Sequence, residues 1–139
     1  MTYLTPAALF DAVVDSRNRG DLETYLGCYE PTATIVLQPG TVASGQDALR
    51  GFFAFFSSLK PTFTLTGRQF VEGEEITLHL SAWTLTGTDA DRKPIAWAGR
   101  TTDVLRKQKD GGWLVALDNP WGTAHWTPQP RSRGENHAH

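Results

Sequence analysis

The stretch that decides the fold is Trp113-Leu114-Val115-Ala116-Leu117-Asp118-Asn119-Pro120-Trp121-Gly122. It has the apolar run of a strand, followed by a carboxylate and an amide. A preceding run, Arg100–Arg106, carries a second carboxylate, Asp103, among apolar neighbours. Successive side chains of a strand point to opposite faces, and a polar group that is buried without a partner lowers stability. The two runs therefore predict a sheet that lines a pocket and places a few polar groups at its base.

The chain around this stretch predicts an antiparallel meander. Apolar and β-branched residues fill the runs 63–71, 76–86 and 94–107, and the last strand covers 113–119. Lys109-Asp110-Gly111-Gly112 joins the last two strands as a hairpin turn, because its glycines accept positive φ. These four strands form the second half of the predicted fold.

The first half predicts three helices and one short strand. Thr5 caps a helix that has proline at its first position, and Arg19-Gly20 ends it. Asp21 begins a second, short helix, a β-branched strand covers 34–38, and Ser44-Gly45-Gln46-Asp47 opens a third helix rich in phenylalanine. This order indicates an α+β fold, with the three N-terminal helices packed in the concave face of a strongly curved, mainly antiparallel sheet. The predicted result is a cone with an internal cavity.

Composition places the chain among single-domain proteins with a sizeable core. Of its 139 residues, 40% are hydrophobic and 11% aromatic, and the formal net charge of -2 disfavours a nucleic-acid partner. No run is long enough to cross a membrane, and the lone Cys28 fits a reducing cytoplasm. The four histidines have no ligand spacing, so no metal site is expected. We expect one domain at 1–126 and a disordered tail at 127–139.

Four segments of the chain match a known family in their order and spacing. They are Gly20–Tyr29, Ala33–Val36, Ser44–Phe53 and Gly112–Gly122. Together they resemble the ketosteroid-isomerase-like, or SnoaL-like, family of the nuclear-transport-factor-2-like superfamily, which has the cystatin-like cone fold. The resemblance spans roughly residues 7–122 and implies a homodimer with a hydrophobic cavity and no cofactor. Members of this superfamily include steroid isomerases, polyketide cyclases, epoxide hydrolases, dehydratases and cavity proteins without a known reaction.

The family's catalytic residues carry over only in part. Gln38 stands before Pro39, where ketosteroid isomerases have an aspartate base, and an amide is not basic enough to take a carbon-bound proton. Val13 stands near the position of the family's tyrosine donor and has no proton to give. Asp103 matches the family's third group, an aspartic acid whose pKa is raised by an apolar site. The resemblance therefore argues against steroid isomerisation by the family's mechanism.

Strand alternation extends the candidate site beyond Asp103. If Asp103 points inward, His79 and Trp83 on the preceding strand do so as well. A His79–Asp103 pair could then replace the missing base near neutral pH. The candidate catalytic residues are thus Asp103 and His79, and the candidate ligand-binding residues are Gln38, Phe53, Trp83, Trp97, Asn119 and Trp121.

Each candidate also has a structural interpretation. His79 can be a structural or interface histidine, and Asp103 can be a buried carboxylate held by an indole or a backbone amide. Asp118 and Asn119 can be turn residues that precede Pro120. The tryptophans of the strands can be core residues first and ligand walls second.

Two functions from different classes stay open at this point. The first is a binding protein for a small apolar ligand, a hydrophobic and ring-containing metabolite of polyketide-like or steroid-like kind, as an accessory protein of secondary metabolism. The second is a cofactor-independent isomerase, cyclase or hydrolase that uses Asp103 and His79.

One strand also predicts an interface. Ile76, Leu78, Leu80 and Ala82 fall on the same face of their strand and leave it apolar. A contiguous exposed apolar patch usually marks an interaction surface. We expect a homodimer through the sheet, and a module that binds another protein on this face is a third interpretation.

Overall fold

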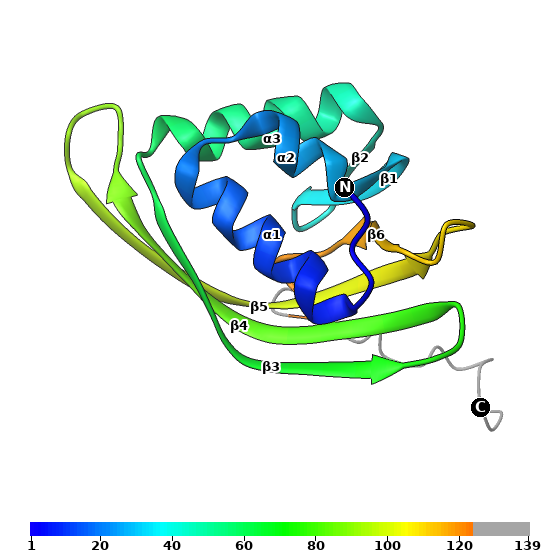
Figure 1. The fold of residues 1–139 in the computed structure, drawn as a ribbon. Helices are drawn as coiled ribbons and strands as arrows, with labels where there is room; N and C mark the ends of the chain where they lie inside the picture. The colour runs from blue at the N-terminus through cyan, green and yellow to red at the C-terminus, as the bar shows by residue number, and fades with distance from the viewer. Residues whose placement is uncertain (124–139) are drawn as a thin grey trace, which may run out of the picture.

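The chain folds into three helices that lie over one six-stranded sheet (Figure 1). The structure is a computed structural model and describes residues 1–123. Its elements in order are α1 (Pro6–Arg19), α2 (Leu22–Gly27), β1 (Tyr29–Gln38), β2 (Thr41–Ser44), α3 (Gln46–Ser58), β3 (Thr62–Glu72), β4 (Ile76–Thr88), β5 (Pro94–Lys107) and β6 (Trp113–Asp118). The predicted α+β class and the three helices are confirmed. The predicted domain end at 126 and the predicted tail at 127–139 lie outside the described residues.

The sheet is mixed, with the strand order β2-β1-β6-β5-β4-β3. Its pairs are antiparallel except for β1 and β6, which run parallel. β4 and β5 form a long hairpin, paired from Ile76 and Arg106 to Thr88 and Pro94. In Figure 1 this hairpin curves beneath α1, and its far end rises toward α3, so the sheet wraps around the first helix.

The first strand begins five residues earlier than the sequence predicts, at Tyr29. Its pairing with β6 is irregular between Tyr29 and Thr34. Pro31 falls in this gap, where its missing N–H removes no ladder hydrogen bond. The turn after β1 leads into β2, an edge strand that was not predicted, because four residues are too few to show a period.

The first helix has the caps that its sequence predicts. The Thr5 side chain accepts a hydrogen bond from the backbone N–H of Ala8, and Pro6 occupies the first helical position. Gly20 ends the helix in the left-handed conformation at φ 69°, and its N–H donates to the Arg17 carbonyl. Between the caps, Leu9, Phe10 and Val13 are buried against the sheet side of the helix. These caps and contacts fix both ends of the helix and hold its apolar side against the concave face of the sheet.

The far end of the β4–β5 hairpin is fastened to the end of α3. The backbone N–H of Thr88 donates to the Leu59 carbonyl at 2.8 Å. A Cβ on Gly87 would lie 2.3 Å from the same Leu59 oxygen, so only glycine permits this approach. The contact holds the end of β5, with Trp97, opposite the apolar face of α3. Among residues 1–123, no helix is long and apolar enough to span a membrane.

Candidate functional site

An apolar groove of about 500 Å³ lies between α3 and the ends of β1 and β5. Its aromatic lining is unusually accessible for such large side chains, because Phe55 is 54% exposed and Trp97 is 38% exposed. The lining residues are Leu37, Gln38, Asp47, Ala48, Gly51, Phe52, Phe55, Phe56, Trp97 and Trp121. Three of the predicted ligand-binding residues, Gln38, Trp97 and Trp121, thus lie around one space.

Helical spacing explains the α3 side of the groove. Positions 48, 51, 52, 55 and 56 are three or four residues apart and share one side of the helix. Phe52 and Phe56 are buried at the base, whereas Phe55 stands at the rim. Trp97 meets Phe56 edge to face at 6.3 Å between ring centroids, so β5 closes the opposite side.

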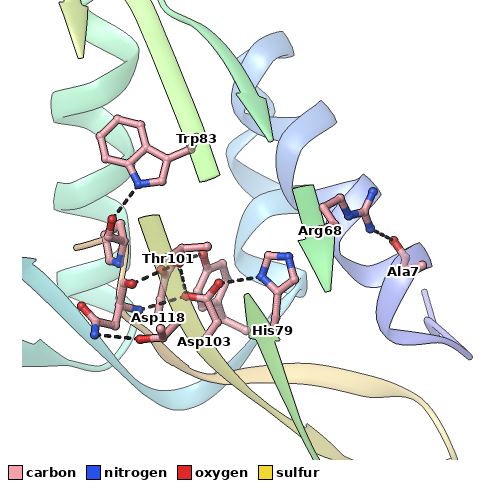
Figure 2. A network of polar contacts seen from close by, with 11 residues as sticks. Ala7, Arg68, His79, Trp83, Thr101, Asp103 and Asp118 are labelled. Atoms are coloured by element: carbon pink, nitrogen blue, oxygen red, sulfur yellow. Dashed lines mark hydrogen bonds and ion pairs between the residues drawn. The ribbon is translucent and has the colours of Figure 1, made fainter. Parts of the chain in front are cut away.

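Asp103 is the centre of a buried polar network beneath α1 (Figure 2). One carboxyl oxygen, Oδ1, accepts from the Thr101 hydroxyl at 2.8 Å and from the Asn119 backbone N–H at 3.0 Å. The other, Oδ2, lies 2.9 Å from Nδ1 of His79. The predicted His79–Asp103 pair is therefore present, because the two residues are register partners on β4 and β5.

Asp118 is a second buried carboxyl in this network, and it hydrogen-bonds to Asp103. The Tyr29 hydroxyl donates to its Oδ2 at 2.5 Å. Burial raises the pKa of Asp118, and the negative charge of Asp103 raises it further. Burial also raises the pKa of Asp103, but the hydrogen bonds from Asp118, Thr101 and Asn119 oppose that rise. Asp118 therefore holds the shared proton and donates it toward Asp103.

His79 is neutral and closed off from the voids of the protein. Burial, with a smaller contribution from the nearby Arg68 charge, lowers its pKa to about 4. Since the Asp103 carboxylate can only accept, Nδ1 of the neutral ring carries the proton and Nε2 is an acceptor. Nε2 has no hydrogen-bond partner among residues 1–123. The His79 ring packs against Phe10 and Phe70, with 3.9 Å and 5.0 Å between the ring centroids. This is the arrangement of a structural histidine.

The last strand differs from the alternation that the sequence predicts. Asn119 was expected to point inward, but Asp118 does so instead. The register shifts between the pairs Leu105–Val115 and Val104–Leu117, which leaves one extra residue in β6. This bulge reverses the inward face beyond it. The Asn119 side chain donates to the Thr102 hydroxyl and to the Gly122 carbonyl, and so holds the turn after the strand.

The spaces beside the buried carboxyls and beside the neighbouring aromatic rings are small. The void at Asp103 and Asp118 measures about 20 Å³, and a second one, beside Phe53 and Phe63, about 10 Å³. The sequence predicts one cavity that holds Asp103 together with Trp97 and Trp121. The structure separates these residues instead: Asp103 borders the void of about 20 Å³, whereas Trp97 and Trp121 line the groove.

Two of the predicted ligand-binding residues, Trp83 and Phe53, are buried in the interior and do not line the groove. Trp83 is buried, and its indole N–H donates to the Pro120 carbonyl at 2.6 Å. Its ring lies against Gly99, where a Cβ would be 2.7 Å from the indole. Phe53 is buried too and borders the smaller void. Neither residue is among those that line the 500 Å³ groove.

The sequence interpretation missed Arg17 and undervalued Asp118. Arg17 follows Phe10 and Val13 on the inward side of α1, and all three line the void at the two carboxyls. Its guanidinium carbon lies 4.0 Å from the ring centroid of Phe63. The spacing of seven and four residues was a usable signal. The bulge that turns Asp118 inward has no comparable signal in the sequence.

Residues 1–123 contain no group of three or more His, Cys, Asp or Glu side chains that could hold a metal ion. Cys28 is buried, and burial raises the pKa of its thiol to about 11. A thiol with so high a pKa is a poor nucleophile at neutral pH.

Fold and site together define a class of protein: a small α+β cone with an aromatic groove at its edge and buried carboxyls in its sheet. The chain matches the family model of the SnoaL-like domain over residues 10–116. It belongs to this family, as its resemblance to ketosteroid-isomerase-like proteins implied.

Solved structures agree with the family. A ketosteroid isomerase-like protein from Erwinia carotovora atroseptica is 22% identical, with a TM-score of 0.69 over 81% of this chain and 89% of that one. A protein with a cystatin-like fold from Caulobacter vibrioides is 16% identical, with a TM-score of 0.69 over 81% of this chain and 83% of that one. A Xanthomonas campestris protein, provisionally named a calcium/calmodulin-dependent protein kinase II association domain, is 22% identical, with a TM-score of 0.72 over 86% of both chains. At these identities the likeness concerns the fold alone. A search of curated proteins found no match.

Proposed function

We propose that this protein binds a flat, hydrophobic, ring-containing metabolite in the groove between α3 and β5. The observation that carries the proposal is the exposure of Phe55 and Trp97 around a space of about 500 Å³, which is within the size range of small-molecule sites. Exposed aromatic faces are stabilised by stacking on a planar ligand. Gln38 and Asp47 are the polar members of the lining and would orient a substituent at the rim.

The class of metabolite follows from the same surface. A rigid, polycyclic compound of polyketide-like or steroid-like shape offers a planar apolar face with few polar groups. Binding of such a compound suits an accessory protein of secondary metabolism. The buried, high-pKa thiol of Cys28 supports a location in a reducing cytoplasm.

The test uses N-phenyl-1-naphthylamine, a neutral ring compound whose fluorescence rises in apolar sites. We expect saturable binding to the full chain, weakened about tenfold by Phe55→Ala or Trp97→Ala, since an aromatic contact contributes about 1 kcal/mol or more beyond area burial. Both side chains are partly exposed, so the variants should fold. Leu4→Ala, an exposed apolar residue elsewhere, is the matched control. Equal binding by all four proteins would reject the groove as the site.

A second candidate function is cofactor-independent acid–base catalysis, the alternative that the sequence raised with Asp103 and His79. It is favoured by the protonated Asp118 beside the ionised Asp103, since two carboxyls with different proton affinities can act as acid and base. His79 is a positioning residue in this scheme, because it lines none of the voids described and holds Asp103 instead.

This candidate is tested with the ketone 2-tetralone, dissolved in D₂O. The α-protons of 2-tetralone exchange with the solvent by general base catalysis, and NMR follows the exchange. Exchange above the buffer rate that falls about a hundredfold in Asp103→Asn would support the candidate. The exposed Asp91→Asn should keep the wild-type rate. Exchange no faster than in buffer would leave ligand binding as the only proposed function.

We also propose that the protein is a homodimer through the outer face of the sheet. Register pairs place Val71, Leu78, Val104 and Leu117 in one row across four strands on this face. Val71 and Leu78 are exposed, as is Ile76 nearby. Val104 and Leu117 are half-buried, and burial of this apolar row against a second copy would stabilise a dimer.

A further inference from the structure

We propose that Arg17 makes the groove selective for ligands that carry a carboxylate, and that it binds this carboxylate at the inner end of the groove. The inference rests on the proposed binding function and adds the chemical class of the ligand. It is carried by the position of Arg17, by the absence of an ion pair or hydrogen bond to its guanidinium among residues 1–123, and by its closeness to the groove wall.

Arg17 differs from the other described arginines in its environment. It is half-buried, whereas the others are exposed. Arg19, Arg68 and Arg106 each contact a carboxylate within 3.3 Å. Among residues 1–123 the Arg17 side chain makes no ion pair or hydrogen bond, and it lies over the rings of Phe63, Phe56 and Phe52, with its guanidinium carbon 4.0, 5.2 and 5.5 Å from their centroids.

The two buried carboxyls near Arg17 interact with its charge without forming an ion pair with it. The Arg17 charge lowers the pKa of both Asp103 and Asp118, but neither carboxyl forms an ion pair with its guanidinium: Asp118 keeps its proton, and both oxygens of Asp103 accept hydrogen bonds from other groups. The guanidinium is therefore a partly desolvated cation whose contacts are aromatic faces. A bidentate, charge-assisted pair with a carboxylate is stronger than these cation–π contacts.

Arg17 also stands directly behind the groove. It lines the void at Asp103 and the smaller void. Phe56 borders both the smaller void and the groove. One aromatic side chain thus separates the guanidinium from a ligand stacked in the groove, and a rotamer change of Phe56 would connect them. Arginine has a long, flexible stem and can complete the approach from its own side.

The ligand that fits these features is a planar ring system with a carboxylate on one edge. Its rings would stack between Trp97 and the phenylalanines of α3, and its carboxylate would reach Arg17. A ligand carboxylate would supply the bidentate ion pair that no side chain of residues 1–123 makes with this partly buried guanidinium.

The experiment compares two probes of nearly the same shape, 2-naphthoate and its neutral amide, 2-naphthamide, by titration calorimetry with the full chain. We expect wild type to bind the carboxylate at least about tenfold more tightly than the amide, as expected for a hydrogen bond to a charged group. Arg17→Met keeps the apolar stem and should abolish this preference without weakening amide binding. Arg17→Lys should retain part of it.

The matched control is Arg19→Met on the same helix, where the arginine is exposed and paired with Asp15. It should keep the wild-type preference. Equal binding of both probes by wild type would overturn the role of Arg17 and leave the groove function intact. Binding of neither probe would count against both the groove function and the role of Arg17. A preference for the carboxylate that survives Arg17→Met would overturn the role of Arg17, because the carboxylate would then bind elsewhere.

Discussion

Asp103 organises the interior of this protein at the level of single residues. Its carboxylate links β4, β5 and β6 through His79, Thr101 and the Asn119 backbone. The sequence predicts its inward position and its pairing with His79, because β4 and β5 pair without interruption from one end to the other. It does not predict the role of Asp118, since one extra residue in β6 reverses the face on which the side chain lies.

A first prediction concerns the proton on Asp118. Its folded-state pKa is raised, so the folded state keeps a proton that the unfolded state releases. The stabilisation is fully present below the unfolded pKa and is lost as pH rises toward the folded pKa. The folded-state pKa of His79 is lowered, so His79 makes the free energy of unfolding rise with pH. That rise is complete by about pH 6.5, the pKa of an unfolded histidine. Between about pH 6.5 and pH 8, the free energy of unfolding should therefore decrease, by at most about 1.4 kcal/mol per pH unit.

Asp118→Asn tests this, because an amide can accept from Tyr29 and donate to Asp103 as the protonated acid does. Urea unfolding of this variant should show little slope over the same pH range. The exposed Asp91→Asn should keep the wild-type slope. A slope that Asp118→Asn leaves unchanged would mean that another group binds the proton.

At the level of elements, two close approaches of the long β4–β5 hairpin position the site. Gly87 lies against Leu59 at the end of α3, and Gly99 lies beneath the Trp83 ring. The sequence reveals the hairpin through the alternation of apolar and polar residues in its two strands. It does not reveal which glycines meet another part of the chain, because that depends on contacts between residues distant in sequence. The same limit explains why one shared cavity was predicted where the structure has a separate groove.

A second prediction concerns Gly99. A Cβ added at Gly99 would lie 2.7 to 2.9 Å from three atoms of the Trp83 indole. This indole is buried and hydrogen-bonded to the Pro120 carbonyl. Gly99→Ala should therefore lower the free energy of unfolding by about 1–3 kcal/mol through overpacking. Gly27→Ala is the matched control, since Gly27 ends α2 with open space around it. It should be neutral or slightly stabilising. Chemical denaturation of both variants distinguishes a packing effect from a general effect of the added methyl.

At the level of the whole molecule, the outer face of the sheet exposes apolar side chains that nothing in the monomer covers among residues 1–123. The sequence indicates it through Ile76, Leu78, Leu80 and Ala82, and the structure continues it across neighbouring strands at Val71, Val104 and Leu117. A single strand could not show that continuation, because the register between strands sets it.

A third prediction follows for the oligomeric state. Sedimentation velocity at micromolar concentration should show a dimer for the wild type. Leu78→Lys should give a monomer, because it places a charge at the centre of the apolar row. Leu4→Lys, at an exposed apolar position outside the sheet, should leave the dimer intact. A monomeric wild type would reject the proposal without affecting the groove.

The parallel pairing of β1 with β6 has a consequence for how the protein is made. Trp121, just beyond β6, donates its indole N–H to the Val36 carbonyl on β1, 85 positions earlier in the chain. Both sides of this contact border the groove, through Leu37 and Gln38 on one side and Trp121 on the other. Pairings so distant in sequence form late, because a long loop must close first. The groove proposed as the binding site is therefore completed only after β6 and Trp121 have joined β1.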